Sequence, residues 1–233
     1  MKALIIIAHP EPQSMNHSMM NVMVERLKFH GWTVEISDLY AEDFTMSPSP
    51  SDFNQLKNPL RFSLAHEQLN ASLTSNYQRE IQDQQRRLKE ADLVIFQFPL
   101  WWYSIPAILK GWVERVLGNG FAYDDEHVFE NGLLKGKRAM LSLTTGATNE
   151  ELIADSQYTG SIEQMLKPFI GGVLKFCGID WVTTFLAPAV SRMNNNDVKQ
   201  MFKNLSLEID QVVSGYPGGS STELSKATAI EMI

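Results

Sequence analysis

The sequence predicts an α/β protein built on one doubly wound, five-stranded parallel sheet. Two observations carry this prediction. Short apolar runs recur along the chain without alternating polar positions, which is typical of strands buried on both faces of a parallel sheet. Segments with apolar residues at helical spacing lie between these runs, and an alternation of strands and helices favours right-handed crossovers within one sheet.

The elements follow in order along the chain. The first strand is expected at 3–8 and the first helix at 15–30, where Gly31 stands in the position that often ends a helix. The other strands are expected at 33–37, which is the weakest run, and at 93–98, 139–144 and 181–186. The other helices are expected at 77–91, 105–117, 161–176 and 196–213, the last with Asn195 or Asn196 as its N-cap.

The expected strand order is 2-1-3-4-5, which places a topological switch point between the first and third strands. Ligands of such sheets bind at the carboxyl ends of the strands next to that point. Residues 1–214 are taken as one domain and 215–233 as a C-terminal tail. The long segments at 41–75 and 118–137 are additions that a minimal five-stranded fold does not contain. The sequence assigns no role to the first of them.

Composition restricts the class of protein. The chain has 233 residues, of which 44% are hydrophobic and 20% charged, as expected of a domain that buries its own core. A formal net charge of −7 argues against nucleic acid, which binds basic surfaces. The first apolar run ends at His9, too early for a signal peptide or a membrane span. We expect a cytoplasmic protein without a metal site, in which the single cysteine, Cys177, is a small buried residue.

The segment after the third strand carries the most specific signal. Pro99 and Leu100 are followed by three consecutive aromatic residues, Trp101, Trp102 and Tyr103. Aromatic rings and backbone amides at the carboxyl edge of a sheet suit a flat ligand with a polar rim, so this segment predicts a flavin site. The alternative is an apolar surface that pairs with a second copy, and both interpretations can hold together.

Two further strand ends carry polar groups. The loop that begins at His9 lacks the glycines of a dinucleotide-binding turn, but Ser14, Asn16 and the start of a helix predict a phosphate site. The alternative for Ser14 is a plain N-cap, and His17 is expected to face solvent. The fourth strand ends in residues that permit close approach of a ligand, namely Thr144, Thr145, Gly146 and Ala147. The segment 121–123 is either core or an aromatic wall over a second substrate.

With these residues in view, the chain resembles the NAD(P)H:quinone oxidoreductase family of the flavodoxin-like superfamily. The similarity is most specific in segments 91–100, 106–112 and 121–123, and segments 143–146 and 176–178 add to it. It implies a flavodoxin-like fold and a homodimeric enzyme. It also implies ping-pong, two-electron hydride transfer from NAD(P)H through bound FAD, with FMN less favoured, to a quinone.

The resemblance also assigns residues. It implies that the FAD diphosphate is bound by His9, Ser14, Met15 and Asn16. It implies that the flavin ring lies between two loops, one matched by Pro99, Leu100, Trp102 and Tyr103 and the other by Thr144, Thr145 and Gly146. Trp101 and Ala147 lie in the same two loops and are also expected to bind the cofactor. Tyr123 matches a tyrosine of the substrate pocket, and Tyr158 is given a hydrogen-bonding role near the flavin. The chain departs from the animal enzymes at Trp101, where they have glutamine, and at Asp125, where they have a second pocket tyrosine.

Two other functions stay open at this point. Some bacterial relatives are flavin-binding ancillary subunits of potassium-efflux systems, which act by docking on a membrane transporter. A one-electron carrier of the flavodoxin type would use the same fold, but the aromatic pocket for a second substrate argues against it. The sequence does not distinguish NADH from NADPH.

Overall fold

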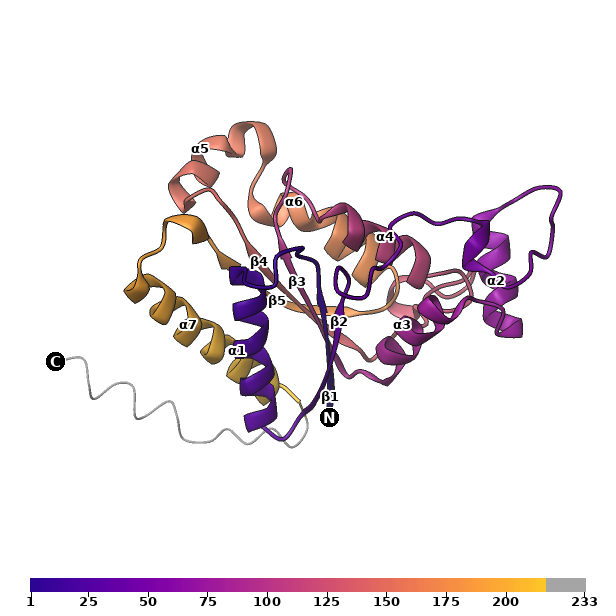
Figure 1. The fold of residues 1–233 in the computed structure, drawn as a ribbon, viewed down its shortest axis with the longest axis horizontal. Coiled ribbons are helices and arrows are strands. Elements are labelled where there is room, and N and C mark those ends of the chain that lie inside the picture. The colour runs from indigo at the N-terminus through magenta and orange to yellow at the C-terminus, as the bar shows by residue number, and fades with distance from the viewer. Residues whose placement is uncertain (217–233) are drawn as a thin grey trace.

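The computed structural model describes residues 1–216 and contains the predicted sheet (Figure 1). Its five strands are parallel and are hydrogen-bonded in the order β2-β1-β3-β4-β5. They are β1 (Lys2–Ile7), β2 (Thr33–Asp38), β3 (Leu93–Pro99), β4 (Arg138–Thr144) and β5 (Asp180–Ala187). The fold class, the strand order and the five strands are confirmed, with strand ends that differ by no more than one residue from those expected.

Helices cover both faces of the sheet (Figure 1). The α-helices are α1 (Met15–Phe29), α2 (Leu64–Thr74), α3 (Arg79–Glu90), α4 (Ala107–Val116), α5 (Asn149–Thr159), α6 (Ile162–Phe169) and α7 (Asn195–Ser214). Shorter helical turns are η1 (Pro50–Asp52), η2 (Phe129–Asn131), the π-helix η3 (Ile170–Lys175) and η4 (Val190–Arg192). None of the helices within residues 1–216 has the length and apolar character needed to cross a membrane.

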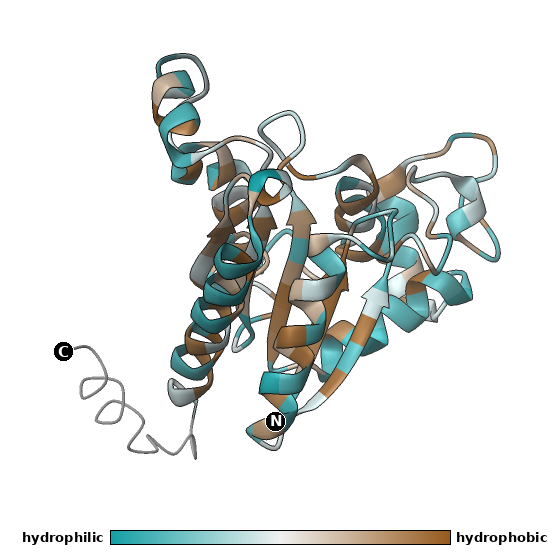
Figure 2. Ribbon diagram, turned by 60° about the vertical axis from the view of Figure 1, so that its left-hand side comes forward, coloured by the Kyte–Doolittle hydropathy of each residue, from teal (hydrophilic) through white to brown (hydrophobic). Residues whose placement is uncertain are grey.

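Residues of β1 show why its apolar run is continuous. Ile5 and Ile7 belong to the core beneath α1 and α7, whereas Leu4 and Ile6 belong to the core beneath α3, α4 and α6. Successive side chains of a strand point to opposite faces, so a strand covered on both faces is apolar at every position. The hydrophobic colouring of the central strands follows this arrangement (Figure 2).

Helix ends were predicted less well than strands. The first helix ends as expected, because His30 is its C-cap and Gly31 follows with a φ of 77°. The helix expected at 161–176 is instead two pieces, α6 and then the π-helix η3. The N-cap of α7 is Asn194 rather than either of its two neighbours, because the Asn194 side chain accepts the backbone N–H groups of residues 196 and 197.

The segment 41–75 is ordered and contains α2, which the sequence did not predict. Beneath it, Phe53, Ala71, Tyr77 and Ile81 form a small core of their own. Arg115 of α4 is 3% exposed and donates to the Asp52 carboxylate at 2.9 Å, which ties the segment to the main body. Burial and hydrogen bonding therefore give this segment a structural role.

Two smaller expectations concern Cys177 and the tail. Cys177 is buried, as expected, and burial raises the pKa of its thiol to about 12, so it is an apolar core residue rather than a reactive group. Of the expected tail, Gly215 and Tyr216 are described, and the Tyr216 ring packs on Trp32 with centroids 4.8 Å apart. The remainder, 217–233, lies outside the described residues.

Candidate active site

The three loops predicted to bind one ligand meet at the carboxyl edge of the sheet. Asn16, in the first turn of α1, donates through Nδ2 to Thr144 Oγ1 at 3.0 Å. The backbone N–H of Leu100 donates to the Thr144 carbonyl at 2.8 Å, and the rings of His9 and Trp101 lie 5.9 Å apart. Each loop therefore contacts both of the others, although they are far apart in the sequence.

Gln97 is a residue of this site that sequence reasoning missed. It lies on β3, is 0% exposed, and donates through Nε2 to Asn16 Oδ1 at 2.7 Å. Because Asn16 Oδ1 accepts this bond, the Asn16 amide nitrogen is free to donate to Thr144. Gln97 Oε1 has no partner within the described structure, which is uncommon for a buried oxygen. The sequence did offer one indication of this role, because Gln97 is the single polar residue in the otherwise apolar run 93–98.

The aromatic turn after β3 has an unusual backbone. Trp102 and Tyr103 have φ values of 52° and 57°, and Ser104 N–H closes the turn on the Trp101 carbonyl at 3.0 Å. Such turns usually carry Asn-Gly, and each large side chain in this conformation costs about 1–2 kcal/mol. Trp102 is nevertheless 94% exposed. Backbone strain that displays an aromatic side chain to solvent is typical of a ligand-binding site.

The start of α1 presents the polar part of the site. Ser14 is the N-cap, as the alternative interpretation held, and its Oγ accepts the His17 backbone N–H at 3.3 Å. His9 accepts the Glu11 backbone N–H through Nδ1 at 3.1 Å, and burial lowers the pKa of His9. The first N–H groups of a helix bind anions readily, so these residues fit a phosphate group.

The expectation for His17 was wrong. Its side chain does not face solvent, and the residue is only 7% exposed. It is held between Ser14 and Asp38 by one hydrogen bond at each ring nitrogen, and each of these is 3.0 Å long. Helical spacing alone could not reveal this, because Asp38 comes from the end of β2, the neighbouring strand in the sheet.

The loop after β4 is fixed by hydrogen bonds of Thr145 and leaves open space at Gly146. Thr145 donates its backbone N–H to the Ala187 carbonyl at 3.0 Å and its hydroxyl to the Ala147 carbonyl at 2.7 Å. A Cβ atom added at Gly146 would meet no atom within 4 Å. The protein itself therefore does not require a glycine here, and the backbone of this loop is open to close approach by a ligand.

The two predicted tyrosines lie apart from this site. Tyr123 follows α4 and packs on Phe176 with ring centroids 5.1 Å apart, near the amino ends of β4 and β5. Its neighbour Ala122 is fully buried, so the segment 121–123 is partly core, as one interpretation expected. Tyr158 lies on α5 and is 84% exposed. The structure gives neither tyrosine a contact with the three loops among the described residues.

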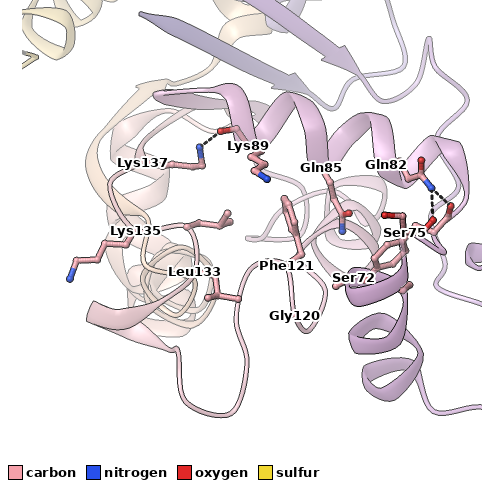
Figure 3. A pocket seen from close by; sticks show the side chains of 13 residues that line it. Ser72, Ser75, Gln82, Gln85, Lys89, Gly120, Phe121, Leu133, Lys135 and Lys137 are labelled. Atoms are coloured by element: carbon pink, nitrogen blue, oxygen red, sulfur yellow. Dashed lines mark hydrogen bonds between the residues drawn. The ribbon is translucent and has the colours of Figure 1, made fainter. Parts of the chain in front are cut away.

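A separate cavity of about 650 Å³ lies between α2, α3 and the segment 118–137 (Figure 3). Phe121 projects into it, and its rim carries Lys89 and Lys135. Lys137 also lines it but donates to the carbonyls of residues 89 and 91, and so closes the end of α3. None of the predicted flavin-binding residues lines this cavity, so it is distinct from the site at the carboxyl edge.

The parallel sheet and its three converging loops define a protein of the flavodoxin-like class, and the family model described as "Flavodoxin-like fold" matches residues 1–211. The human protein named "Ribosyldihydronicotinamide dehydrogenase [quinone]" is 44% identical over 191 residues, which are 82% of this chain and 80% of the human protein. The guinea pig (Cavia porcellus) protein named "NAD(P)H dehydrogenase [quinone] 1" is 42% identical over 178 residues, or 76% of this chain and 64% of that protein.

Solved structures agree with these relatives. A Klebsiella pneumoniae protein described as a quinone reductase superposes with a TM-score of 0.85 at 31% identity, covering 91% of this chain and 85% of that one. General stress protein 14 of Treponema denticola, solved in complex with FMN, shares the fold at 23% identity and a TM-score of 0.64, covering 91% of this chain and 99% of that one. The chain therefore belongs to the NAD(P)H:quinone oxidoreductase family of the flavodoxin-like superfamily, whose members are flavoproteins.

Proposed function

We propose that this protein is an FAD-dependent NAD(P)H:quinone oxidoreductase that transfers two electrons by a ping-pong mechanism. The observation that carries the proposal is the convergence of three loops on one sheet edge through Asn16, Thr144 and Leu100. When bound, FAD would supply the redox-active ring that serves both substrates. Membership of a family of quinone reductases supports the same activity.

The chain's own residues would bind and orient the cofactor. The N-terminus of α1, with Ser14 and Asn16, would hold the diphosphate, with His9 adding a hydrogen bond. Trp102 and Tyr103 would present an apolar face to the ring. Peptide N–H groups of the loops after β3 and β4 would donate to its polar edge, and preorganised donors of this kind stabilise negative charge on a reduced ring. The other expected residues of the site, Met15, Pro99, Leu100, Trp101, Thr144, Thr145, Gly146 and Ala147, belong to the same three loops.

The position of Tyr123 favours a homodimer. Tyr123 lies near the amino ends of β4 and β5, whereas the proposed flavin site lies at the carboxyl edge. If Tyr123 lines the substrate pocket, as the resemblance implies, it does so in the site of a second copy. The exposed aromatic residues Trp101 and Trp102 would then lie at a shared interface, so both interpretations of the aromatic turn hold together. Asp155 of α5 accepts a hydrogen bond from Tyr103 at 3.4 Å, so α5 lies beside this turn, and Tyr158 of the same helix is exposed.

A steady-state assay tests the proposal. The purified protein is reconstituted with FAD and supplied with menadione and one of three donors: NADH, NADPH or dihydronicotinamide riboside, the last suggested by the name of the human relative. Parallel double-reciprocal lines for at least one donor are expected. Turnover no faster than that of free FAD would contradict the proposal. Release of the cofactor by heat, followed by chromatography, distinguishes FAD from FMN, and FMN alone would contradict the choice of FAD.

The alternative of an ancillary subunit of a potassium-efflux system receives no support from the relatives described above, which are named as dehydrogenases or reductases. Co-purification with a membrane antiporter, together with weak quinone turnover, would favour that alternative. A cytoplasmic location follows from the sequence argument and is part of the proposal.

A further inference from the structure

A partly buried chain of three polar side chains, with His17 in the middle, lies behind the proposed diphosphate site. Ser14 Oγ is 3.0 Å from His17 Nδ1, and His17 Nε2 is 3.0 Å from Asp38 Oδ2. The other carboxylate oxygen, Asp38 Oδ1, accepts the Ala41 backbone N–H at 3.1 Å, which holds the carboxylate in place at the end of β2. Ser14 is thus the only member of the chain that also caps α1, where a phosphate would bind.

The hydrogen-bonding partners of His17 determine which of its ring nitrogens carries a proton in every state. A carboxylate can only accept, so His17 Nε2 carries a proton and donates it to Asp38. Nδ1 then has two states. In a neutral imidazole Nδ1 accepts, and the single hydroxyl proton of Ser14 must point at it. In an imidazolium Nδ1 donates to Ser14 Oγ, and the hydroxyl proton of Ser14 is free to point elsewhere.

These two states differ in what Ser14 offers to an anion. With neutral His17, Ser14 presents only lone pairs toward the helix N-terminus, which repel a phosphate oxygen. With charged His17, Ser14 can donate to that oxygen, and a positive charge lies one side chain behind it. We infer that His17 is a positioning residue for the cofactor, and that binding of the FAD diphosphate is coupled to uptake of one proton by His17. This inference rests on the proposed function.

The surrounding charges are compatible with this coupling. The ionisable groups that face His17 are Asp38 on β2, which favours the charged ring, and His9 in the loop after β1, whose ring centroid is 6.4 Å away. A charged His9 would oppose the coupling, but burial lowers the pKa of His9 and its Nδ1 accepts the Glu11 backbone N–H. Both features disfavour a charge on His9, and of these two rings only that of His17 is hydrogen-bonded to a carboxylate.

Uptake of a proton on binding determines how the affinity for FAD changes with pH. The complex holds one proton more than the free protein in the pH range where free His17 is neutral. FAD affinity is therefore highest at low pH and weakens by about tenfold per pH unit as pH rises through this range, until the complex also loses the proton. FAD is the appropriate probe, because a phosphate monoester such as that of FMN itself titrates near pH 6 and would obscure the effect.

Isothermal titration calorimetry of the apoprotein with FAD tests the coupling. Runs in buffers of different ionisation enthalpy, repeated at several pH values, give the number of protons taken up, and the expected uptake rises to at most one per FAD. His17→Gln should abolish the uptake and flatten the pH dependence of Kd. Asp38→Asn, which keeps the shape but removes the charge, should reduce the uptake. His30→Gln is the matched control and should retain it, because His30 also pairs with a carboxylate, Asp210, but lies at the opposite end of α1.

A second measurement does not depend on a variant. In protein labelled with ¹³C at histidine Cε1, the titration midpoint of the His17 signal should move to higher pH when FAD is bound, even if His17→Gln fails to fold. Binding of FAD without proton uptake, or equal uptake by His17→Gln, would overturn the inference and leave the proposed function intact. Absence of FAD binding at every pH would contradict both.

Discussion

Gly146 is the residue at which the proposed site can be tested with the least disturbance to the fold. A Cβ atom added there meets no protein atom within 4 Å, and the φ of Gly146 lies outside the left-handed region. We therefore expect Gly146→Val to change the free energy of unfolding of the apoprotein by less than about 0.5 kcal/mol. The same side chain would occupy the space assigned to the flavin ring, so FAD affinity should fall by about tenfold or more.

Urea unfolding of the apoprotein and fluorescence titration with FAD measure the two effects of Gly146→Val. Gly172 is the matched control, because an added Cβ there also meets nothing within 4 Å, but the residue lies in the π-helix η3. Gly172→Val should leave FAD affinity unchanged. Unaltered affinity in Gly146→Val would exclude the loop after β4 from the flavin site.

Single residues also show how far sequence reasoning reached. The meeting of the loops that carry His9, Asn16 and Thr144 was predictable, because these polar residues follow buried strands and parallel strands share one carboxyl edge. The role of Gln97 was not predictable, since it depends on a side-chain contact with Asn16. His17 was misjudged for the same reason, because its partner Asp38 is brought to it only by the pairing of β1 with β2.

At the scale of elements, α1 and α7 are joined by one ionic cluster. Arg26 donates to both carboxylate oxygens of Asp210, at 2.5 and 2.6 Å, and His30 lies 2.7 Å from the same group. Burial alone would raise the pKa of Asp210, but the hydrogen bonds from Arg26 and His30 outweigh it and lower the pKa below its usual value. The carboxylate therefore stabilises the packing of these two helices.

We expect Asp210→Asn to lower the free energy of unfolding by about 1–2 kcal/mol at pH 7. Because the pKa of Asp210 is lowered in the folded state, its contribution is complete above the ordinary aspartate value of 3.8 and is lost as pH falls through the lower folded value. Urea unfolding at pH 7 and at pH 3 should therefore show a difference between the two proteins that shrinks in acid.

The control for Asp210→Asn is Asp83→Asn, which removes an exposed i,i+4 pair with Arg79 and should change stability little at either pH. An Asp210→Asn difference that stayed constant between pH 7 and pH 3 would show that lost packing or hydrogen bonding, rather than ionisation, is responsible.

The elements that sequence reasoning missed share a physical cause. Strands of the central sheet are buried on both faces and therefore gave unambiguous apolar runs. By contrast, α2 and α5 each bury only a few side chains, such as Ala71 and Leu152, and their helical periodicity is correspondingly weak. The change from α6 to a π-helix follows Pro168 and precedes Gly171 and Gly172, but the local sequence alone does not specify which hydrogen-bonding pattern results.

At the scale of the whole molecule, the strand order determines what one chain can supply to its own site. The carboxyl ends of β1, β3 and β4 bring together the three loops of the proposed flavin site, while the segment with Tyr123 precedes β4 and lies near the opposite edge. A homodimer with two-fold symmetry would have two equivalent sites, each built from the loops of one copy and Tyr123 of the other. This arrangement predicts that two different inactive variants can restore activity together.

The pair to combine is Gly146→Val, which is expected to weaken FAD binding and is assayed at an FAD concentration too low to saturate it, and Tyr123→Ala, which removes the proposed pocket residue. In a heterodimer of the two, one site would combine both defects and the other would be intact, so a purified heterodimer should recover about half of the wild-type turnover. If Tyr123 instead acted in its own chain, each heterodimer site would carry one defect and activity would not return. Differently tagged copies allow the heterodimer to be isolated, and light scattering establishes that it is a dimer. A monomeric protein with full activity would contradict the shared site, because Tyr123 could not then reach the carboxyl edge.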